Sequence, residues 1–215
     1  MKRILFLLLI LSGLNCIYAQ WDLSFDMGLD FKSAPSYRDY INYNHASTSA
    51  DLLPTFKSSP CFGGEVDYKL NTNFALGLEY NFQIDSYNTN NGSGGSYQIS
   101  YNLQRPSLLA YYILSGEGYQ FKFGGGAGLR YVSLSETISG TANYRATGLG
   151  FLIKTEGNTK LSDHFYALIG VNVRYDITGK LTNPSQDLIN PESNNENVNL
   201  NSISFGIYFG ITFIL

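Results

Sequence analysis

The sequence predicts an all-β protein, an eight-stranded antiparallel up-and-down transmembrane β-barrel, and three observations support this prediction. Apolar and polar residues alternate with a period of two in eight separate segments. The connections between these segments are alternately long and short. Only 14% of the 215 residues are charged and 15% are aromatic, whereas charged residues make up roughly 25% of an ordinary soluble domain.

Composition and charge exclude several other classes of protein. With 44% apolar residues and 22 glycines, the chain resembles neither a disordered protein nor a coiled coil. Its 14 basic and 17 acidic residues give a formal net charge of −3 without a basic run, so we expect no nucleic-acid partner. No group of His, Cys, Asp or Glu has metal-ligand spacing, and we expect neither a metal nor a cofactor.

Residues 1–19 have the features of an export signal. Lys2 and Arg3 precede an apolar stretch that is shorter than the about 20 residues of a membrane-spanning helix. We expect cleavage after Ala19, so that residues 20–215 form the barrel domain.

A lipoprotein signal, with Cys16 as the acylated residue, is the alternative to simple cleavage. The residue before this cysteine is Asn15, where lipoprotein signals have a small side chain, so the sequence favours cleavage after Ala19.

The first four expected strands each have one apolar face. In 21–31 the odd positions are apolar and the even positions are Asp, Ser or Gly. Segments 62–70 and 74–85 have their apolar residues at even positions. The fourth strand, 97–114, begins with an apolar row at odd positions and is expected to continue past a proline. That row consists of Tyr97, Ile99, Tyr101 and Leu103.

The remaining four strands follow the same rule. Segments 119–131, 148–154 and 165–176 have apolar residues at odd positions, and 202–215 ends the sequence with alternating Ile and Phe. Central strands of a parallel sheet are apolar on both faces, which these strands are not. Eight is an even number and the minimum for a bacterial outer-membrane barrel.

Loop lengths give an independent test of the barrel. The long connections have 11 or more residues and are 32–59, 86–96, 135–147 and 178–198. The short connections have 7 or fewer and are 71–72, 115–118 and 157–163. This alternation predicts four extracellular loops and periplasmic termini. A secreted sandwich is the alternative, but it would leave a large apolar surface in water.

Charged residues lie on the faces that we expect to point into the barrel. The acidic ones on the first three strands are Asp22, Asp26, Asp30, Glu65, Asp67, Glu79 and Asp85. The basic ones on later strands are Lys122, Arg130, Lys154 and Arg174, with Glu156 and Asp176 among them. Side chains fill the interior of an eight-stranded barrel, so these charges are expected to pair and close the lumen. A gated narrow pore, a proton path and a ligand site are the alternatives.

Residue types suited to catalysis are scarce. Ser162, Asp163 and His164 are adjacent on one turn and cannot adopt the geometry of a catalytic triad. Only His45, with two serines nearby (Ser47 and Ser49), offers a nucleophile and base in an outer loop. We therefore expect no enzymatic activity.

Two segments resemble a known family. Segment 101–112, in which a strand meets Pro106 and then two leucines and paired aromatics, is similar to the mid-barrel region of small outer-membrane β-barrel proteins. These are OmpA/OmpX-like in architecture. Together with the glycine-rich segment 123–128, the segment resembles especially the PorT-like barrels of the Bacteroidota. Arg105 departs from the apolar surroundings expected around the proline, which leaves the register there open. The resemblance implies a component of a protein secretion machinery.

The last strand resembles the terminal assembly signal of such barrels. It has a polar residue, a glycine and two apolar anchors, which are Tyr208, Gly210, Phe213 and Leu215. An edge strand of this kind is expected to pair with the barrel assembly machinery during biogenesis.

The sequence therefore favours a non-enzymatic, monomeric barrel of the cell outer membrane with a structural, adhesive or surface-binding role. Its expected partners are outer-membrane lipid and an extracellular or envelope protein that contacts the long loops. Aromatic residues suited to such contacts in the first loop are Tyr37, Tyr40, Tyr43 and Phe56. The alternatives are a PorT-like secretion component, a lipid-modifying enzyme and a narrow pore.

Overall fold

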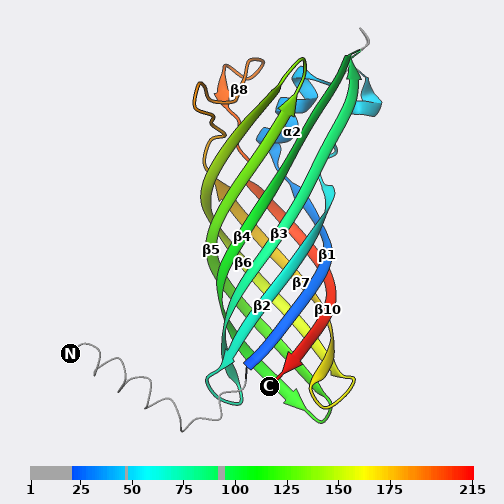
Figure 1. Ribbon diagram of the computed structural model, residues 1–215, viewed down its shortest axis with the longest axis vertical. Helices are drawn as coiled ribbons and strands as arrows, with labels where there is room; N and C mark the ends of the chain where they lie inside the picture. Colours follow the sequence, from blue (N-terminus) through cyan, green and yellow to red (C-terminus); the bar gives the residue numbers. More distant parts are fainter. Residues whose placement is uncertain (1–20, 47, 92–94) are drawn as a thin grey trace, which may run out of the picture.

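The computed structural model describes residues 21–46, 48–91 and 95–215, and eight long strands of this part close into an antiparallel barrel (Figure 1). The strands are β1 (Trp21–Ser33), β2 (Lys57–Lys69), β3 (Phe74–Asn91), β4 (Gly95–Gly116), β5 (Tyr119–Thr137), β6 (Thr141–Lys160), β7 (Phe165–Thr178) and β10 (Ser202–Ile214). The predicted signal, residues 1–19, lies outside the described residues.

Each strand pairs with its neighbour in the chain, and pairing between β1 and β10 closes the barrel. Leu23 lies opposite Phe213 and Phe31 opposite Phe205 in this closing pair. The short connections between strands, the start of β1 and the end of β10 lie at one end of the barrel, with α2 and β8 at the opposite end (Figure 1). The expected up-and-down fold is confirmed. No helix among the described residues has the length and apolar character needed to cross a membrane.

The outward face of the barrel carries a band of apolar side chains. Outward residues such as Phe25, Leu78 and Ile153 are 56%, 56% and 70% exposed. Aromatic pairs lie at the end with the short turns, where the Trp21 and Tyr68 rings are 4.9 Å apart and the Phe165 and Phe213 rings 5.0 Å. An apolar band flanked by aromatic residues is the surface that an outer-membrane barrel presents to lipid.

Beyond this band the strands β3 to β6 reverse their polarity. Their outward positions become polar, and the inward positions become apolar. The outward polar residues include Asn88, Ser100, Asn102, Ser133, Ser135 and Asn143, and the inward apolar ones Ile99, Leu103, Val132, Leu134 and Tyr144. A membrane-spanning strand needs only about 9–11 residues, whereas β4 has 22. The outer part of the barrel is therefore built like a soluble protein, with an apolar core.

This reversal corrects two sequence predictions. The odd-numbered row at the start of the fourth strand was expected on the outer apolar face, but it points inward with at most 4% exposure: Tyr97, Ile99, Tyr101 and Leu103. Segments 86–96 and 135–147 were expected to be long loops, but much of each is strand. Asn91 lies opposite Gly95, and Thr137 lies opposite Thr141. Their polar residues face water on the outside of the extended wall, which gives them the composition of a loop.

Two connections remain long and fold over the mouth of the barrel as an outer cap, which we define as residues 34–46, 48–56 and 179–201. The first contains α2 (Pro35–Asn44) and η2 (Ser49–Asp51), and the second contains β8 (Ile189–Asn190) and β9 (Glu196–Asn197). Pro35 starts α2, where the missing N–H costs nothing. The buried face of α2 joins the apolar core inside the mouth, with Tyr37, Tyr40 and Ile41 against residues such as Leu181, Leu188 and Val198.

Candidate functional site

We call the half of the barrel that ends at the short turns the lower barrel. Its inward face carries charged side chains in three tiers. The tier nearest the short turns is centred on Lys122 of β5, which forms an ion pair with Asp67 of β2. Its Nζ also lies 3.2 Å from Asp22 of β1, and Lys69 Nζ lies 2.9 Å from the same carboxylate. A side chain at Gly77 of β3 would collide with Asp67, so glycine there leaves room for the ion pair.

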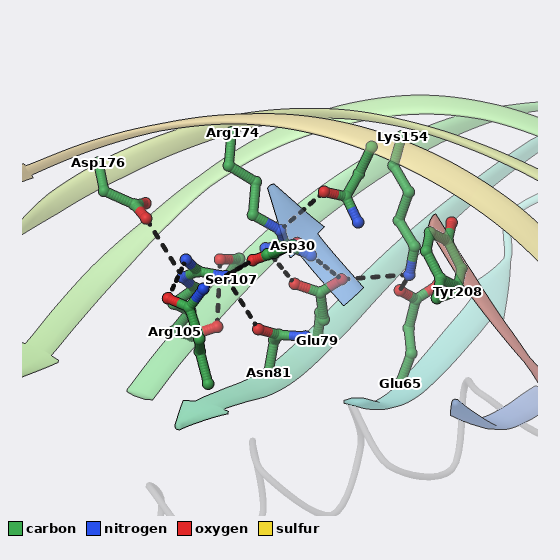
Figure 2. A network of polar contacts seen from close by, with 12 residues as sticks. Asp30, Glu65, Glu79, Asn81, Arg105, Ser107, Lys154, Arg174, Asp176 and Tyr208 are labelled. Carbon is green, nitrogen blue, oxygen red and sulfur yellow. Dashed lines mark hydrogen bonds and ion pairs between the residues drawn. The ribbon is translucent and has the colours of Figure 1, made fainter. Parts of the chain in front are cut away.

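The middle tier joins two cations to three carboxylates. Figure 2 shows both cations and the two carboxylates of Glu65 and Glu79. Lys154 Nζ lies 2.6 Å from Glu65, 3.1 Å from Glu79 and 2.8 Å from Glu156. Arg174 binds Glu79 with both of its terminal nitrogens, at 2.8 and 3.0 Å. All five side chains are at most 2% exposed. Bidentate guanidinium–carboxylate pairs of this kind have a fixed geometry, which favours an ordered interior.

Two tyrosines complete the middle tier. The Tyr111 hydroxyl donates a hydrogen bond of 2.8 Å to Glu65. Tyr208 of β10 lies beneath Lys154, whose Nζ is 5.0 Å from the ring centroid, and its hydroxyl lies 3.3 Å from Glu156. The cation–π contact and the hydrogen bonds give Lys154 and its carboxylates polar partners on several sides.

The upper tier is organised around Arg105 of β4. Its guanidinium lies 2.5 Å from Asp30 and 3.2 Å from Asp176, and it donates hydrogen bonds of 2.8 Å to Gln83 and 3.2 Å to Asn81 (Figure 2). These contacts come from β1, β3 and β7, so one side chain links strands on opposite sides of the barrel.

Arg130 of β5 shares Asp176 with Arg105 and donates a hydrogen bond of 3.2 Å to the Ser107 hydroxyl. The pairing of β4 with β5 is interrupted at Arg105 and Pro106 and resumes in the same register at Ser107, opposite Gly128. The register that the sequence left open is therefore continuous, with Pro106 on the outer face and Arg105 in the interior.

Twelve of the thirteen predicted lumen charges take part in ion pairs: Asp22, Asp30, Glu65, Asp67, Glu79, Asp85, Lys122, Arg130, Lys154, Glu156, Arg174 and Asp176. Asp26 also lies on the inward face of β1, but it forms no ion pair within the described part of the chain. The sequence-based set missed Arg105. Reading the outward row backwards from Leu114 through Tyr112, Ala110 and Leu108 reaches Pro106, which would have placed Arg105 inside.

The mouth of the barrel has a separate polar cluster around Glu136 of β5. This carboxylate accepts hydrogen bonds from the Tyr40 hydroxyl at 2.6 Å and the Tyr97 hydroxyl at 2.9 Å. His45 stacks on Tyr97 with ring centroids 3.7 Å apart, and its Nε2 is 3.8 Å from Glu136. Burial lowers the pKa of His45, an effect that the Glu136 carboxylate opposes.

The residues considered for catalysis are not assembled into a reactive group. His164 Nδ1 lies 2.9 Å from the backbone carbonyl of Ile214, and Asp163 pairs with Lys160 at 3.2 Å. His45 faces Tyr97 and Glu136, while Ser47 lies outside the described residues. Among the residues that the structure describes, no group of three or more His, Cys, Asp or Glu could hold a metal ion.

A family model described as outer membrane protein beta-barrel domain matches residues 4–213. The chain belongs to this family. As a member of it, the protein is a small barrel of the bacterial outer membrane, which agrees with the lipid-facing apolar band. The comparison with curated proteins found no match.

Solved structures of outer-membrane proteins share the fold of this family member at low sequence identity. Neisserial surface protein A (NspA) is 12% identical, with a TM-score of 0.51 over 90% of this chain and 96% of that one. Ail of Yersinia pestis, in complex with the heparin analogue sucrose octasulfate, is 10% identical, with a TM-score of 0.52 over 93% and 100%. OprG of Pseudomonas aeruginosa is 13% identical, with a TM-score of 0.52 over 92% and 96%.

The residues of the expected assembly signal lie in β10 and just after it. Tyr208 points into the barrel as part of the middle tier, and Gly210 allows close approach to β1, because a Cβ there would meet the Phe25 carbonyl. Phe213 packs outside against Phe165, and Leu215 is 62% exposed.

Proposed function

We propose that this protein is a non-enzymatic outer-membrane barrel with a closed lumen, periplasmic termini and an outer cap that binds a partner at the cell surface. The observation that supports the closed lumen is the burial of the inward side chains along the length of the barrel. Three tiers of ion pairs occupy the lower barrel, and an apolar core fills the mouth above them. We expect a lumen filled in this way to offer no continuous path for water or substrate.

The outer cap supplies the surface for the proposed partner. Of the four aromatic residues expected to contact it, Tyr37 and Tyr40 are buried and hold α2 in the mouth. Tyr43 and Phe56 are 64% and 55% exposed, and Leu52 is 50% exposed in the same loop. A cap held by its own core presents these apolar side chains on a fixed scaffold, which lowers the entropy lost on binding.

Cell adhesion tests the binding role. Cells displaying the wild type should adhere to immobilised extracellular matrix proteins or to one another more strongly than cells without it. The variant Tyr43→Ser/Phe56→Ser should lose this adhesion at equal surface abundance, because both substitutions lie outside the cap's core. Equal adhesion of wild-type, variant and empty cells would contradict the surface-binding role.

A secretion role is the second candidate, and it is supported by the resemblance of segments 101–112 and 123–128 to PorT-like barrels. A deletion strain that retains normal export of its secreted proteins would rule it out. Mass spectrometry of lipid A from the same strain tests the enzymatic alternative, and we expect an unchanged lipid A.

A further inference from the structure

A small cavity lies between α2 and the mouth of the barrel, and its lining is rich in cations. Its volume is about 20 Å³, and its polar lining comes mainly from Lys32, Arg38, Lys57, Tyr37 and Asp85. A volume of this order holds about one water-sized particle. The lining therefore has three basic side chains and one carboxylate around a space for a single small occupant.

The two lysines are direct cross-strand neighbours. Lys32 of β1 lies opposite Lys57 of β2 in the register of the two strands, an arrangement that destabilises a sheet when the charges are alike. Lys57 is compensated, because its Nζ lies 2.6 Å from Asp85. Lys32 is 4% exposed, and its Nζ contacts are Gln83 Oε1 at 3.4 Å and the face of Tyr101 at 5.0 Å. Lys32 forms no ion pair within the described residues, and the nearest carboxylates, Asp176, Asp85 and Asp30, act on its ammonium only from beyond contact distance. No carboxylate of this part of the chain therefore touches the buried ammonium.

Two further groups that can donate hydrogen bonds belong to the lining of the same cavity, the side chain of Tyr37 and the N-terminus of α2. Tyr37 is 4% exposed, and its hydroxyl has no hydrogen-bond partner within the described part of the chain. The ten-residue helix α2 begins beside the cavity at Ala34, which provides no side-chain cap, and its first turn contains no acidic residue. The uncapped N–H groups and the positive end of the helix dipole favour an anion. The remaining cation, Arg38, already pairs with Asp39 at 2.7 Å.

We propose that this cavity binds one small inorganic anion, of about the size of chloride, which links α2 to β1 and β2. The anion would neutralise Lys32, accept a hydrogen bond from the Tyr37 hydroxyl and cap the helix. The Asp85 carboxylate repels the anion only weakly, because both of its oxygens already have partners. Lys57 binds one oxygen, and the Ser59 hydroxyl donates a hydrogen bond of 2.5 Å to the other. The site would thus hold the outer cap on the barrel.

Bromide can replace chloride and is visible by its anomalous scattering. Crystals of the detergent-solubilised protein grown in sodium bromide should show an anomalous peak in the cavity between Lys32 and Tyr37. The variant Lys32→Met should lose this peak. A wild-type cavity without a bromide peak would overturn the proposal.

Thermal stability gives a second readout at constant ionic strength. The unfolding midpoint of the wild type should rise with chloride when it replaces gluconate, which is too large for the cavity. The chloride concentration that gives half of the rise in midpoint should increase at least about tenfold in Tyr37→Phe, because this variant loses one hydrogen bond to a charged group. In Lys32→Met the midpoint should no longer depend on chloride. The control Lys180→Met removes an exposed cation that pairs with Asp187, and it should respond like the wild type. Equal midpoints in chloride and gluconate, or a response to phosphate alone, would contradict a chloride-sized site.

Discussion

Arg105 is the single residue on which the upper tier depends, because it is fully buried and contacts both Asp30 and Asp176. We expect Arg105→Met to lower the free energy of unfolding by about 3–5 kcal/mol, since it leaves buried carboxylates without a partner. Urea denaturation of the detergent-folded barrel measures this loss. The control Lys180→Met removes an exposed ion pair and should change stability by about 0–1 kcal/mol.

A second substitution separates lost charge pairing from lost packing. Arg105→Met/Asp30→Asn should recover part of the stability, because the carboxylate left by the first change is then neutral. Should Arg105→Met unfold at the same urea concentration as the wild type, the upper tier would not be a buried network of ion pairs around Arg105.

His45 gives the outer cap a dependence on pH. Burial lowers its pKa below the ordinary value near 6.5, so the unfolded chain takes up a proton more readily than the folded one. The contribution of His45 to stability is therefore fully present above about pH 6.5 and is lost as the pH falls through the folded pKa. We expect His45→Gln to lose less stability than the wild type between pH 8 and pH 5, in thermal melts. An identical decline in both proteins would contradict this account.

At the scale of elements, α2 is held by its buried face rather than by helix propensity. Ile41 is 0% exposed in the core of the mouth, whereas Tyr43 is 64% exposed. Replacing a buried Ile with Ala costs about 2–5 kcal/mol, so Ile41→Ala should open the cap and speed proteolysis of residues 34–56 at least about tenfold. The barrel itself should remain folded. Tyr43→Ala is the matched control, and equal cleavage of both variants would show that α2 is not anchored by its inner face.

The last strand carries the test of the assembly signal. Phe213 pairs with Leu23 and Phe165, and the Leu215 amide donates a hydrogen bond to the Trp21 carbonyl at the closing seam. We expect Phe213→Ala/Leu215→Ala to reduce insertion of the barrel, measured as the heat-modifiable fraction in the outer membrane. The control Phe205→Ala/Ile207→Ala removes two apolar groups from the middle of the same strand and should insert. Equal insertion of both variants would refute a terminal signal.

The sequence predicted the strands correctly wherever the alternation of apolar and polar residues comes from one face in lipid and one face in the lumen. The period-two rows of β1, β2, β5, β7 and β10 have one face in lipid, so their inward and outward residues could be assigned directly. The outer halves of β3 to β6 were misread because water, not lipid, lies outside them. There the apolar row faces inward, and the row starting at Tyr97 was assigned to the wrong face.

The candidate site was predictable in part for the same reason. Charges on lipid-facing strands must point inward, and this located Lys122, Lys154 and Glu79 in the lumen. Which charges meet depends on strand tilt and on side chains that reach across the barrel, as Arg174 does to Glu79. The sequence pattern contains neither. The residues that line the cavity at Lys32 come together only because the outer cap folds onto the mouth of the barrel, and the periodicity of the sequence does not predict this.

At the scale of the whole molecule, the barrel has two parts in which the inner and outer faces have opposite polarity. The membrane part has polar side chains inside and apolar ones outside, and the part beyond it has an apolar core inside and a polar wall outside. In the closed lumen that we propose, the ion pairs block the first part and the cap core blocks the second. We therefore expect that loosening one of them leaves the lumen blocked by the other.

Conductance in planar lipid bilayers tests the closed lumen most directly. We expect the wild type to insert without measurable single-channel current, because buried ion pairs and the cap core leave no continuous water path. Arg130→Ala, which removes a partner of Asp176, should lose heat stability and stay closed while the cap remains in place. Steady wild-type currents that increase in proportion to salt concentration would contradict the closed lumen and establish a pore.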